Sequence, residues 1–248
     1  MKVSIITPTY NSEAYIVQTI LSIQRQTYDN WELLITDDCS SDKTIDLLNE
    51  FAGEDNRIKI FQLNINSGGG IARNNSIENA TGRFIAFCDS DDLWTPDKLE
   101  KQIKFMAEND LAFTYSAYQK INEDNEKGGI VNPNPKLTYS DLLKSCQIGC
   151  LTAIYDTFKL GKVYLPEIRK RQDYGLWLKI FQVIGETRGL NNNVLGYYRV
   201  RSNSVSSNKF KAAIYHFKVL RQVGELGKIK ACMYFFNYTI KGLLKYLK

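Results

Sequence analysis

Short β-rich runs alternate with helical patterns throughout the first 120 residues of this 248-residue chain. Runs of apolar and β-branched residues predict strands at Val3–Thr7, Trp31–Thr36, Ile58–Leu63, Phe84–Cys88 and Ala112–Tyr118. Helical spacing and capping residues predict helices at Ser12–Gln26, Asp42–Phe51, Gly70–Ala80 and Pro96–Glu108. This order is typical of βαβ units, in which helices join parallel strands and cover the sheet. We therefore expect an α/β fold containing half of a doubly wound, mostly parallel sheet.

The alternation weakens near residue 121, where the stretch INEDNEKGGIVNPNPK is rich in Asn, Gly and Pro and predicts a loop. A second region with fewer clear elements follows. We expect there a helix at Tyr139–Ser145, a strand at Leu151–Tyr155, a helix after Gln172, a strand at Val194–Tyr198 and a polar loop at Arg201–Asn208. The pattern divides the chain into residues 1–120, residues 121–208 and a tail of residues 209–248.

The cysteine and histidine content argues against a disulfide framework and against a structural zinc site. Five cysteines stand at irregular spacing, and His216 is the single histidine. The N-terminal residues enter an apolar run without a signal-peptide pattern, and no run of about 20 apolar residues predicts a membrane span. We expect a protein of a reducing compartment, cytosolic or bound to a membrane surface, with its cysteines in the core.

The positive charge is concentrated in the tail. Residues 199–248 carry 11 Lys and Arg against one acid, so this segment has a net charge of +10 in a chain of net charge +5. Helical spacing places an apolar stripe opposite a basic face. The stripe comprises Ile229, Cys232, Met233, Phe236, Ile240, Leu243, Leu244 and Leu247, and the opposite face carries Lys230, Asn237, Lys241, Lys245 and Lys248. Such a helix can pack on its own domain, lie on an anionic membrane surface or contact a second copy, and the charge favours the membrane.

Two groups of carboxylates follow predicted strands, at the sheet edge where open α/β folds bind ligands. Asp37 and Asp38 end the second strand, and a carboxylate there can accept hydrogen bonds from a nucleobase or a ribose. Asp89, Asp91 and Asp92 follow the fourth strand. Neighbouring acids repel one another unless a cation neutralises them, and oxygen ligands favour Mg²⁺ or Mn²⁺ on phosphate oxygens. Helix caps or turns are the structural alternative for both groups.

A glycine-rich segment, NSGGGIARN at residues 66–74, opens the third predicted helix. It lacks the Lys-Ser/Thr of a P-loop and the glycine spacing of a dinucleotide fingerprint. Its backbone can approach a nucleotide closely, and Arg73 can face a base or a phosphate. An ordinary turn followed by a helix start explains the same residues.

Together these motifs resemble glycosyltransferase family 2. The resemblance rests on IITPTYN at residues 5–11, the Asp37-Asp38 pair, Ala72-Arg73-Asn74, DSDD at residues 89–92, RQDYGLW at residues 171–177 and YRVRSNSVS at residues 198–206. It covers roughly residues 1–208 and is nearest to bacterial enzymes that assemble surface polysaccharides such as O-antigen or teichuronic acid. It implies the GT-A fold, with a nucleotide-sugar-binding half at 1–120, an acceptor-binding and catalytic-base half at 121–208, and C-terminal amphipathic helices.

The resemblance also implies roles for single positions. Six residues would bind the nucleotide sugar, namely Pro8, Tyr10, Asp38, Arg73, Asp89 and Arg201. Among these, Asp38 would hold the base and Asp89 the ribose or sugar, while Asp91 would hold Mn²⁺ or Mg²⁺ on the diphosphate. Asp173 would be the general base of an inverting transfer, in which one carboxylate takes the proton of the acceptor hydroxyl. The structural alternative for Asp173 is a helix cap.

Two positions depart from the family's pattern. The family commonly has Glu-Asp where this chain has Gln172-Asp173, so the carboxylate expected as the base is kept while the charge of the pocket falls. Many relatives place a histidine metal ligand near the end of the domain, where this chain has Arg201. The ion would then be held by Asp91, phosphates and water, and Arg201 would bind the diphosphate directly.

These observations predict a metal-dependent hexosyltransferase that uses a UDP-sugar donor and a lipid-linked saccharide acceptor at the cytoplasmic face of the cell membrane. A sugar nucleotidyltransferase is one alternative, but it usually has a glycine-rich, basic phosphate loop after the first strand, and TPTYNSEAY has no such loop. A nucleotide-binding scaffold on the membrane is the non-catalytic alternative, and in it Asp173 would be dispensable. Nucleic-acid binding is not expected, because the basic charge lies on one amphipathic tail.

Overall fold

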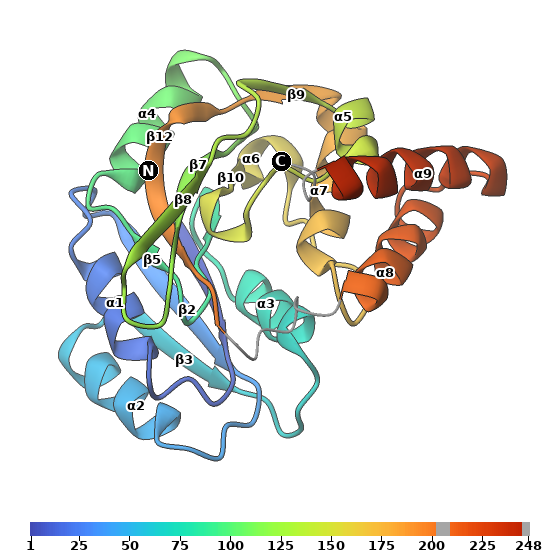
Figure 1. Ribbon diagram of the computed structural model, residues 1–248. Helices are drawn as coiled ribbons and strands as arrows, with labels where there is room; N and C mark the ends of the chain where they lie inside the picture. Colours follow the sequence, from blue (N-terminus) through green and yellow to red (C-terminus); the bar gives the residue numbers. More distant parts are fainter. Residues whose placement is uncertain (202–208, 245–248) are drawn as a thin grey trace.

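The computed structural model describes residues 1–201 and 209–244, and for residues 209–212 and 241–244 it describes the backbone alone. Its largest sheet, of which Figure 1 labels β2, β3 and β10, has six strands in the order β3-β2-β1-β4-β10-β6. These strands are β1 Val3–Thr9, β2 Trp31–Asp37, β3 Ile58–Gln62, β4 Phe84–Phe87, β6 Phe113–Thr114 and β10 Ile154–Asp156. Strands β1 to β4 are parallel, and β10 runs antiparallel between β4 and β6. The predicted α/β fold with a mostly parallel sheet is confirmed.

Helices cover both faces of this sheet. The first 120 residues contribute α1 Ile16–Gln24, α2 Thr44–Glu54, α3 Gly69–Glu78 and α4 Lys98–Glu108, and the second region contributes α5 Tyr139–Lys144, α6 Thr157–Leu160 and α7 Gln172–Ile184. Because successive side chains of a strand point to opposite faces, Ile5 packs among α1, α2 and α4, whereas Ile6 packs in the core that includes α3, α5 and α7. Burial on both faces explains why these strands are continuous apolar runs.

A second, four-stranded sheet has the order β5-β12-β7-β8, and β9 pairs with β11. The bounds are β5 Leu93–Trp94, β7 Ser116–Ile121, β8 Lys127–Val131, β9 Lys136–Thr138, β11 Glu186–Arg188 and β12 Leu190–Arg199. The loop predicted at residues 121–136 is therefore wrong in part, since β8 forms a hairpin with β7. Most residues of β8 are exposed, so no apolar alternation marks it in the sequence. The single strand predicted at Ala112–Tyr118 is divided between the two large sheets.

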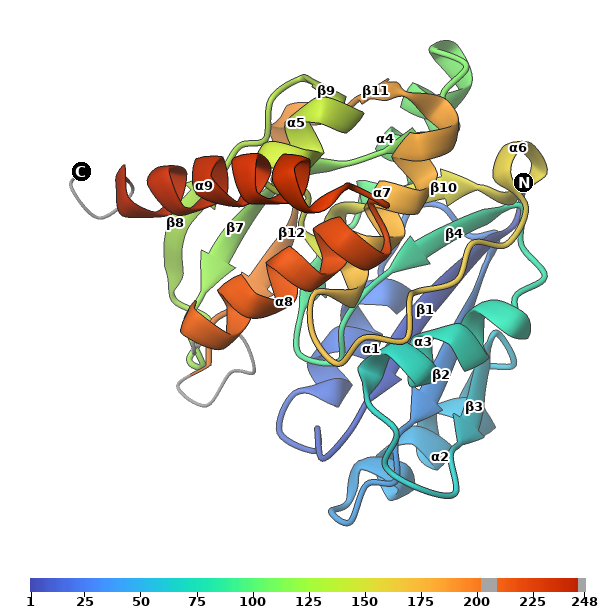
Figure 2. The same cartoon turned by 90° about the vertical axis from the view of Figure 1, so that its right-hand side faces the viewer.

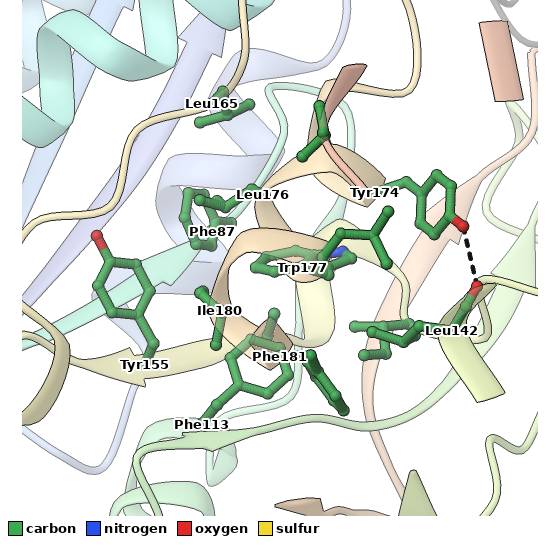
Figure 3. Close-up of a cluster of buried hydrophobic side chains, with 14 of the residues drawn as sticks. Phe87, Phe113, Leu142, Tyr155, Leu165, Tyr174, Leu176, Trp177, Ile180 and Phe181 are labelled. Atoms are coloured by element: carbon green, nitrogen blue, oxygen red, sulfur yellow. Dashed lines mark hydrogen bonds between the residues drawn. The ribbon is translucent and has the colours of Figure 1, made fainter. Parts of the chain in front are cut away.

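Trp177 of α7 lies at the centre of the core beneath the second region (Figure 3). Its ring centroid is 5.5 Å from that of Phe87 in β4 and 5.2 Å from that of Phe113 in β6. In the first turn of the same helix, the Tyr174 hydroxyl donates a hydrogen bond of 3.0 Å to the Leu142 carbonyl. Aromatic packing of this kind fixes orientation as well as burying area. Helix α7 is therefore held rigidly on the sheet.

Two helices, α8 Lys209–Gln222 and α9 Lys228–Leu244, form the tail beside α5 and α7 (Figure 2). Helix α9 contacts the domain through Ala231, Tyr234 and Phe235. The described side chains of the predicted apolar stripe point elsewhere, with exposed fractions of 80% for Ile229, 63% for Met233, 66% for Phe236 and 39% for Ile240. The alternative in which this stripe packs on its own domain is wrong for these residues.

Part of the predicted polar loop and of the predicted C-terminal helix lies outside the residues that the structure describes. Residues 202–208 of the predicted polar loop lie outside the described residues, as do Lys245, Leu247 and Lys248. The side chains of Lys241, Leu243 and Leu244 lie outside them as well. None of the helices in the described parts of the chain is long and apolar enough to cross a bilayer.

Candidate active site

A cleft of about 740 Å³ opens where β1, β2 and β4 end. The order of the large sheet places β2 and β4 on opposite sides of β1, and ligands of open α/β sheets bind outside such a point. All eight site residues predicted from the sequence line this cleft, namely Pro8, Tyr10, Asp38, Arg73, Asp89, Asp91, Asp173 and Arg201. The fold thus brings together positions that are spread over most of the chain.

Asp38 is buried and anchors the glycine-rich loop. Its Oδ1 accepts a hydrogen bond of 2.6 Å from the Ser67 amide, and its Oδ2 accepts one of 2.7 Å from the Gly68 amide. Gly68 has a φ of 93°, a conformation that favours glycine. A carboxylate has about four lone-pair sites, so the anchoring bonds leave acceptor capacity for a ligand. The sequence did not reveal this anchoring, because the partners are 29 and 30 positions apart.

Arg73 enters the cleft from α3 and pairs with Asp89. Its Nη2 donates to Asp89 Oδ1 at 2.5 Å, and its Nη1 donates to the Gly69 carbonyl at 3.2 Å. Burial alone would lower the pKa of Arg73, but the charge of Asp89, the hydrogen bond to it and the charges of other nearby groups together outweigh burial and raise the pKa, so the guanidinium stays charged. The buried Nε has no hydrogen-bond partner within the described part of the chain. The described residues thus leave one charged donor of Arg73 unsatisfied.

The acidic run after β4 has two different environments. Arg201 Nε lies 2.9 Å from Asp91 Oδ2. Burial and the charge of Asp89 raise the pKa of Asp91, and Arg201 opposes them. Asp92 is buried, and its Oδ1 accepts a hydrogen bond of 3.0 Å from the Arg199 amide. Asp92 thus joins the loop to β12, while Asp91, like Asp89, is paired with a side-chain cation at the cleft.

The acidic run fits a divalent cation whose coordination is completed by phosphate. Among residues 1–201 and 209–244, no three His, Cys, Asp or Glu side chains are arranged to hold a metal ion by themselves. Mg²⁺ is commonly bound by one or two carboxylates together with substrate phosphates, so such a site needs its substrate. The raised pKa of Asp91 indicates that its charge is costly where it lies, and a cation would remove that cost.

Asp173 is the second residue of α7. The helix begins after Arg171, which has a φ of 62°, and no side chain caps it, so the interpretation of Asp173 as a helix cap is wrong. Burial raises the pKa of Cys150 well above its usual range, and the charges of Asp89 and Asp173 raise it further. Both carboxylates therefore lie near the same thiol. The rigid packing of α7 fixes Asp173 at the cleft.

The starts of α3 and α7 approach each other closely. A Cβ atom at Gly70 would lie 2.5 Å from Nε2 of Gln172, a separation that real Cβ atoms essentially never show. Glycine at position 70 therefore lets the Gln172 side chain lie against the first turn of α3. The departure from the family's Glu-Asp pattern places a neutral amide, not a second carboxylate, at this contact.

Several cleft residues carry no motif that marks them in the sequence. The rings of Tyr118 and Tyr198 lie 6.0 Å apart, and both line the cleft. Cys146 and Cys150 also line it while packing against the core, and the expectation of core cysteines is wrong for Cys39 and Cys232, which are exposed. A Cβ atom at Gly149 would lie 2.9 Å from Cε1 of Tyr118. The loop between α5 and β10 therefore reaches the cleft by packing closely against the Tyr118 ring. No sequence pattern indicates this contact.

A parallel nucleotide-binding sheet whose edge carries a cleft lined by carboxylates and guanidinium groups defines a sugar transferase of the GT-A fold. Residues 4–162 match the family model of Glycosyl transferase family 2, and the chain belongs to this family. It is 41% identical over 246 residues to TuaG of Bacillus subtilis (strain 168), named for teichuronic acid biosynthesis, with 99% of this chain and 97% of TuaG covered.

A second relative is named for a defined reaction. The chain is 41% identical over 244 residues to the UDP-Glc:alpha-D-GlcNAc-diphosphoundecaprenol beta-1,3-glucosyltransferase WfgD of Escherichia coli, with 98% of this chain and 94% of WfgD covered. Among solved structures, the mannosyltransferase PcManGT of Pyrobaculum calidifontis, in complex with GDP-Man and Mn²⁺, has a TM-score of 0.67 at 19% identity and covers 91% of this chain and 65% of that one. The predicted family, GT-A fold and glycosyltransferase activity are confirmed, which favours them over the nucleotidyltransferase and scaffold alternatives.

Proposed function

We propose that this glycosyltransferase moves glucose from UDP-glucose to the 3-hydroxyl of an α-linked GlcNAc that a diphosphate joins to a polyprenol, during the synthesis of a bacterial surface polysaccharide. The reaction in the name of WfgD, a relative that matches nearly the whole chain, supports this donor and acceptor. The observation that carries the proposal is the gathering of eight predicted site residues in one cleft.

The nucleotide half of the donor binds at the ends of β1 and β2 in this proposal. Tyr10 is half-exposed at the cleft and offers a ring face, and Pro8 lines the wall beside it. Asp38 accepts a hydrogen bond from the uracil through the lone pairs that its loop amides leave open. Arg73 and Arg201 carry positive charge that is paired with the carboxylates of the acidic run, which suits a diphosphate.

Asp173 acts as the general base. Its carboxylate takes the proton of the acceptor hydroxyl while that oxygen forms a bond to the anomeric carbon of glucose. The bond between this carbon and the donor phosphate breaks, and UDP leaves with the electron pair. Attack on an α-linked UDP-glucose from the face opposite UDP gives a β-linked product, in agreement with the linkage in the name of WfgD. The close packing of α7 on the sheet supports this role, because a base must be held at a fixed distance from the proton that it removes.

A divalent cation, Mn²⁺ or Mg²⁺, would be held by Asp91 with Asp89 beside it, and it would supply positive charge for the departing diphosphate. The residues of the chain contribute to the same end. Arg73 remains charged although it is buried, and Arg201 lies next to the expected phosphate position. Preorganised cations of this kind stabilise charge that develops as the bond breaks.

In this proposal the enzyme acts on the cytoplasmic face of the cell membrane, and the exposed stripe on α9 supports this location. The stripe presents Ile229, Met233, Phe236 and Ile240 to solvent. Lys228 and Lys230 are exposed beside it, in a segment of strong positive charge. An apolar face flanked by lysines is typical of helices that lie on anionic lipid surfaces.

The test is product formation by the purified protein. The acceptor is α-GlcNAc diphosphate carrying a short alkyl chain, and the donors are UDP-glucose, UDP-GlcNAc and UDP-galactose, each with Mn²⁺, Mg²⁺ or EDTA. We expect a β-linked glucosyl product from UDP-glucose that requires the metal. Alkyl diphosphate without GlcNAc is the matched control. Equal turnover in EDTA, or no product from any UDP-sugar, contradicts the proposal.

A further inference from the structure

We propose that Arg169, Lys170 and Arg171, the cationic strip, bind the diphosphate of the acceptor. This inference rests on the proposed function, because a diphosphate-linked acceptor enters with it. The three residues are consecutive, and all of them line the cleft. The family resemblance assigns no role to these residues. Its motif in this region, RQDYGLW, begins at Arg171.

The cationic strip lies directly before the proposed base. Four residues lead from Arg169 to Asp173, and since an extended residue spans at most about 3.6 Å, their Cα atoms lie within about 14 Å. In the acceptor, the sugar that bears the reactive hydroxyl is joined directly to the diphosphate. If Asp173 is the base, the diphosphate must lie about one sugar ring from it. The cationic strip is a basic segment that is held near Asp173 because it directly precedes it in the sequence.

The segment that carries the strip is anchored at both ends. Leu165 exchanges two hydrogen bonds with the Asn74 side chain on α3, at 2.8 and 3.0 Å. A Cβ atom at Gly175 would lie 2.5 Å from Cγ of Pro166, so the segment folds closely over the first turn of α7. Arg171 has a left-handed backbone, a conformation that costs free energy and is concentrated at functional sites. The strip is thus presented by a fixed segment.

Arg171 connects the strip to the tail. Its Nη2 donates a hydrogen bond of 2.7 Å to the Tyr238 hydroxyl of α9, and its guanidinium carbon lies 5.5 Å from the centre of the Tyr238 ring. The outward face of the same helix is the exposed apolar stripe. From Asp173 through Arg171 to α9, the contacts thus link the proposed base, the group of cations and a helix with an apolar face. The acceptor has the matching order of sugar, diphosphate and lipid.

The strip is separate from the cations assigned to the donor. Arg73 and Arg201 form ion pairs with Asp89 and Asp91 at the sheet edge. Arg171 instead lies beside the tail. Burial, and to a smaller extent the charge of Arg171, lower the pKa of His216 to about 3. The reaction brings together two diphosphates, and the cleft has a distinct cationic group for each.

The test compares two acceptors that differ in the diphosphate alone. One is α-GlcNAc diphosphate with a short alkyl chain, and the other is the α-GlcNAc glycoside of the same chain. We expect Arg169→Gln and Lys170→Gln each to raise KM for the diphosphate acceptor about tenfold, the loss of one charged hydrogen bond. KM for the glycoside and KM for UDP-glucose should change less than twofold. Arg169→Lys should restore most of the affinity.

Arg188→Gln is the matched control, since Arg188 is exposed on β11 and does not line the cleft. Equal losses with both acceptors, or a rise in KM for UDP-glucose, overturn the assignment of the strip to the acceptor diphosphate. Full affinity of both variants for the diphosphate acceptor overturns it too, while the proposed function stands if the wild type still makes product. Failure of the wild type to glucosylate either acceptor contradicts the proposed function itself.

Binding has its own readout in the single histidine of the chain. His216 is stacked on Tyr238, the partner of Arg171, so an anion at the strip changes the electric field at the imidazole. With labelled histidine and UDP-saturated protein, the His216 NMR signal should shift on addition of the diphosphate acceptor and not of the glycoside. The shift should be lost in Arg169→Gln at the same acceptor concentration. Equal shifts with both acceptors contradict the inference.

Discussion

The Nε atom of Arg201 lies 2.9 Å from Oδ2 of Asp91, so the carboxylate expected to hold a metal is already paired with a cation of the chain. Burial and the charge of Asp89 raise the pKa of Asp91, and the guanidinium opposes both. A divalent cation that binds Asp91 must therefore compete with Arg201.

Arg201→Gln should increase the affinity for Mn²⁺ in the absence of nucleotide by about tenfold. The reason is the removal of a like charge close to the ion, which is worth a few kcal/mol at most when the pair is partly exposed. Free Mn²⁺ is measured by its electron paramagnetic resonance signal during titration. Arg188→Gln, which removes an arginine that does not line the cleft, should leave the affinity unchanged. Unchanged or weaker binding by Arg201→Gln contradicts competition at Asp91.

His216 should make the stability of the fold depend on pH. It is buried between Tyr174 and Tyr238, with ring centroids 4.9 and 3.9 Å away, and its pKa is lowered to about 3. Below the ordinary pKa of about 6.5 the unfolded chain takes up a proton that the folded chain does not, so stability is complete above that pH and falls below it. Between pH 7 and pH 5 this amounts to about 2 kcal/mol.

The measurement is urea denaturation at both pH values for the wild type and for His216→Phe, which keeps an aromatic ring in the stack. The variant should lose about 2 kcal/mol less than the wild type over this range. Parallel pH profiles for the two proteins would show that His216 does not carry the dependence.

Gly149→Ala should impair acceptor use without unfolding the protein. The new methyl group would lie 2.9 Å from the Tyr118 ring, which lines the cleft, so the ring or the loop must move. We expect KM for the acceptor to rise several-fold, while the midpoint of thermal unfolding falls by a few degrees at most. Gly129→Ala on β8 is the control, because a Cβ atom there meets open space. Identical kinetics for both variants would show that the position of the Tyr118 ring does not affect acceptor binding.

Phe236→Asp should weaken binding to anionic vesicles at least tenfold. Phe236 is 66% exposed on the apolar stripe, and the transfer of its ring to lipid is favourable by about 1.5–3 kcal/mol. An aspartate at this position loses that free energy and is repelled by the anionic lipid. Sedimentation with phosphatidylglycerol vesicles gives the bound fraction. Val183→Asp on α7 serves as the control, since Val183 is 74% exposed but lies off the stripe. Wild-type binding by Phe236→Asp, or oligomer formation through the stripe, contradicts the membrane proposal.

The first half of the fold could be predicted closely because its strands are buried on both faces. The strand expected at Trp31–Thr36 is observed at Trp31–Asp37, for example. Strand β8 could not be found in this way, since exposed residues leave no apolar pattern. The helix predicted after Gln172 is observed as α7, Gln172–Ile184, although Arg171 precedes it in a left-handed conformation without a capping side chain.

The same contrast holds for the cleft. Asp38 and Asp91 were recognised because parallel strands deliver their following residues to one sheet edge. Arg199 was missed, although its buried guanidinium donates to the Asp91 carbonyl at 2.9 Å and to the Gln18 side chain at 3.0 Å. These partners are 108 and 181 positions away in the sequence, so the contacts exist only once the second sheet has packed on the first.

The role of Asp173 as base is tested most directly by the rate of glucosyl transfer for Asp173→Asn, with the exposed Asp124→Asn as the control. The amide keeps the shape of the side chain but cannot accept the proton. The account predicts that kcat falls by a factor of about 10² to 10⁴ while the Kd of UDP stays within threefold. A rate for Asp173→Asn within tenfold of the wild type would contradict the account.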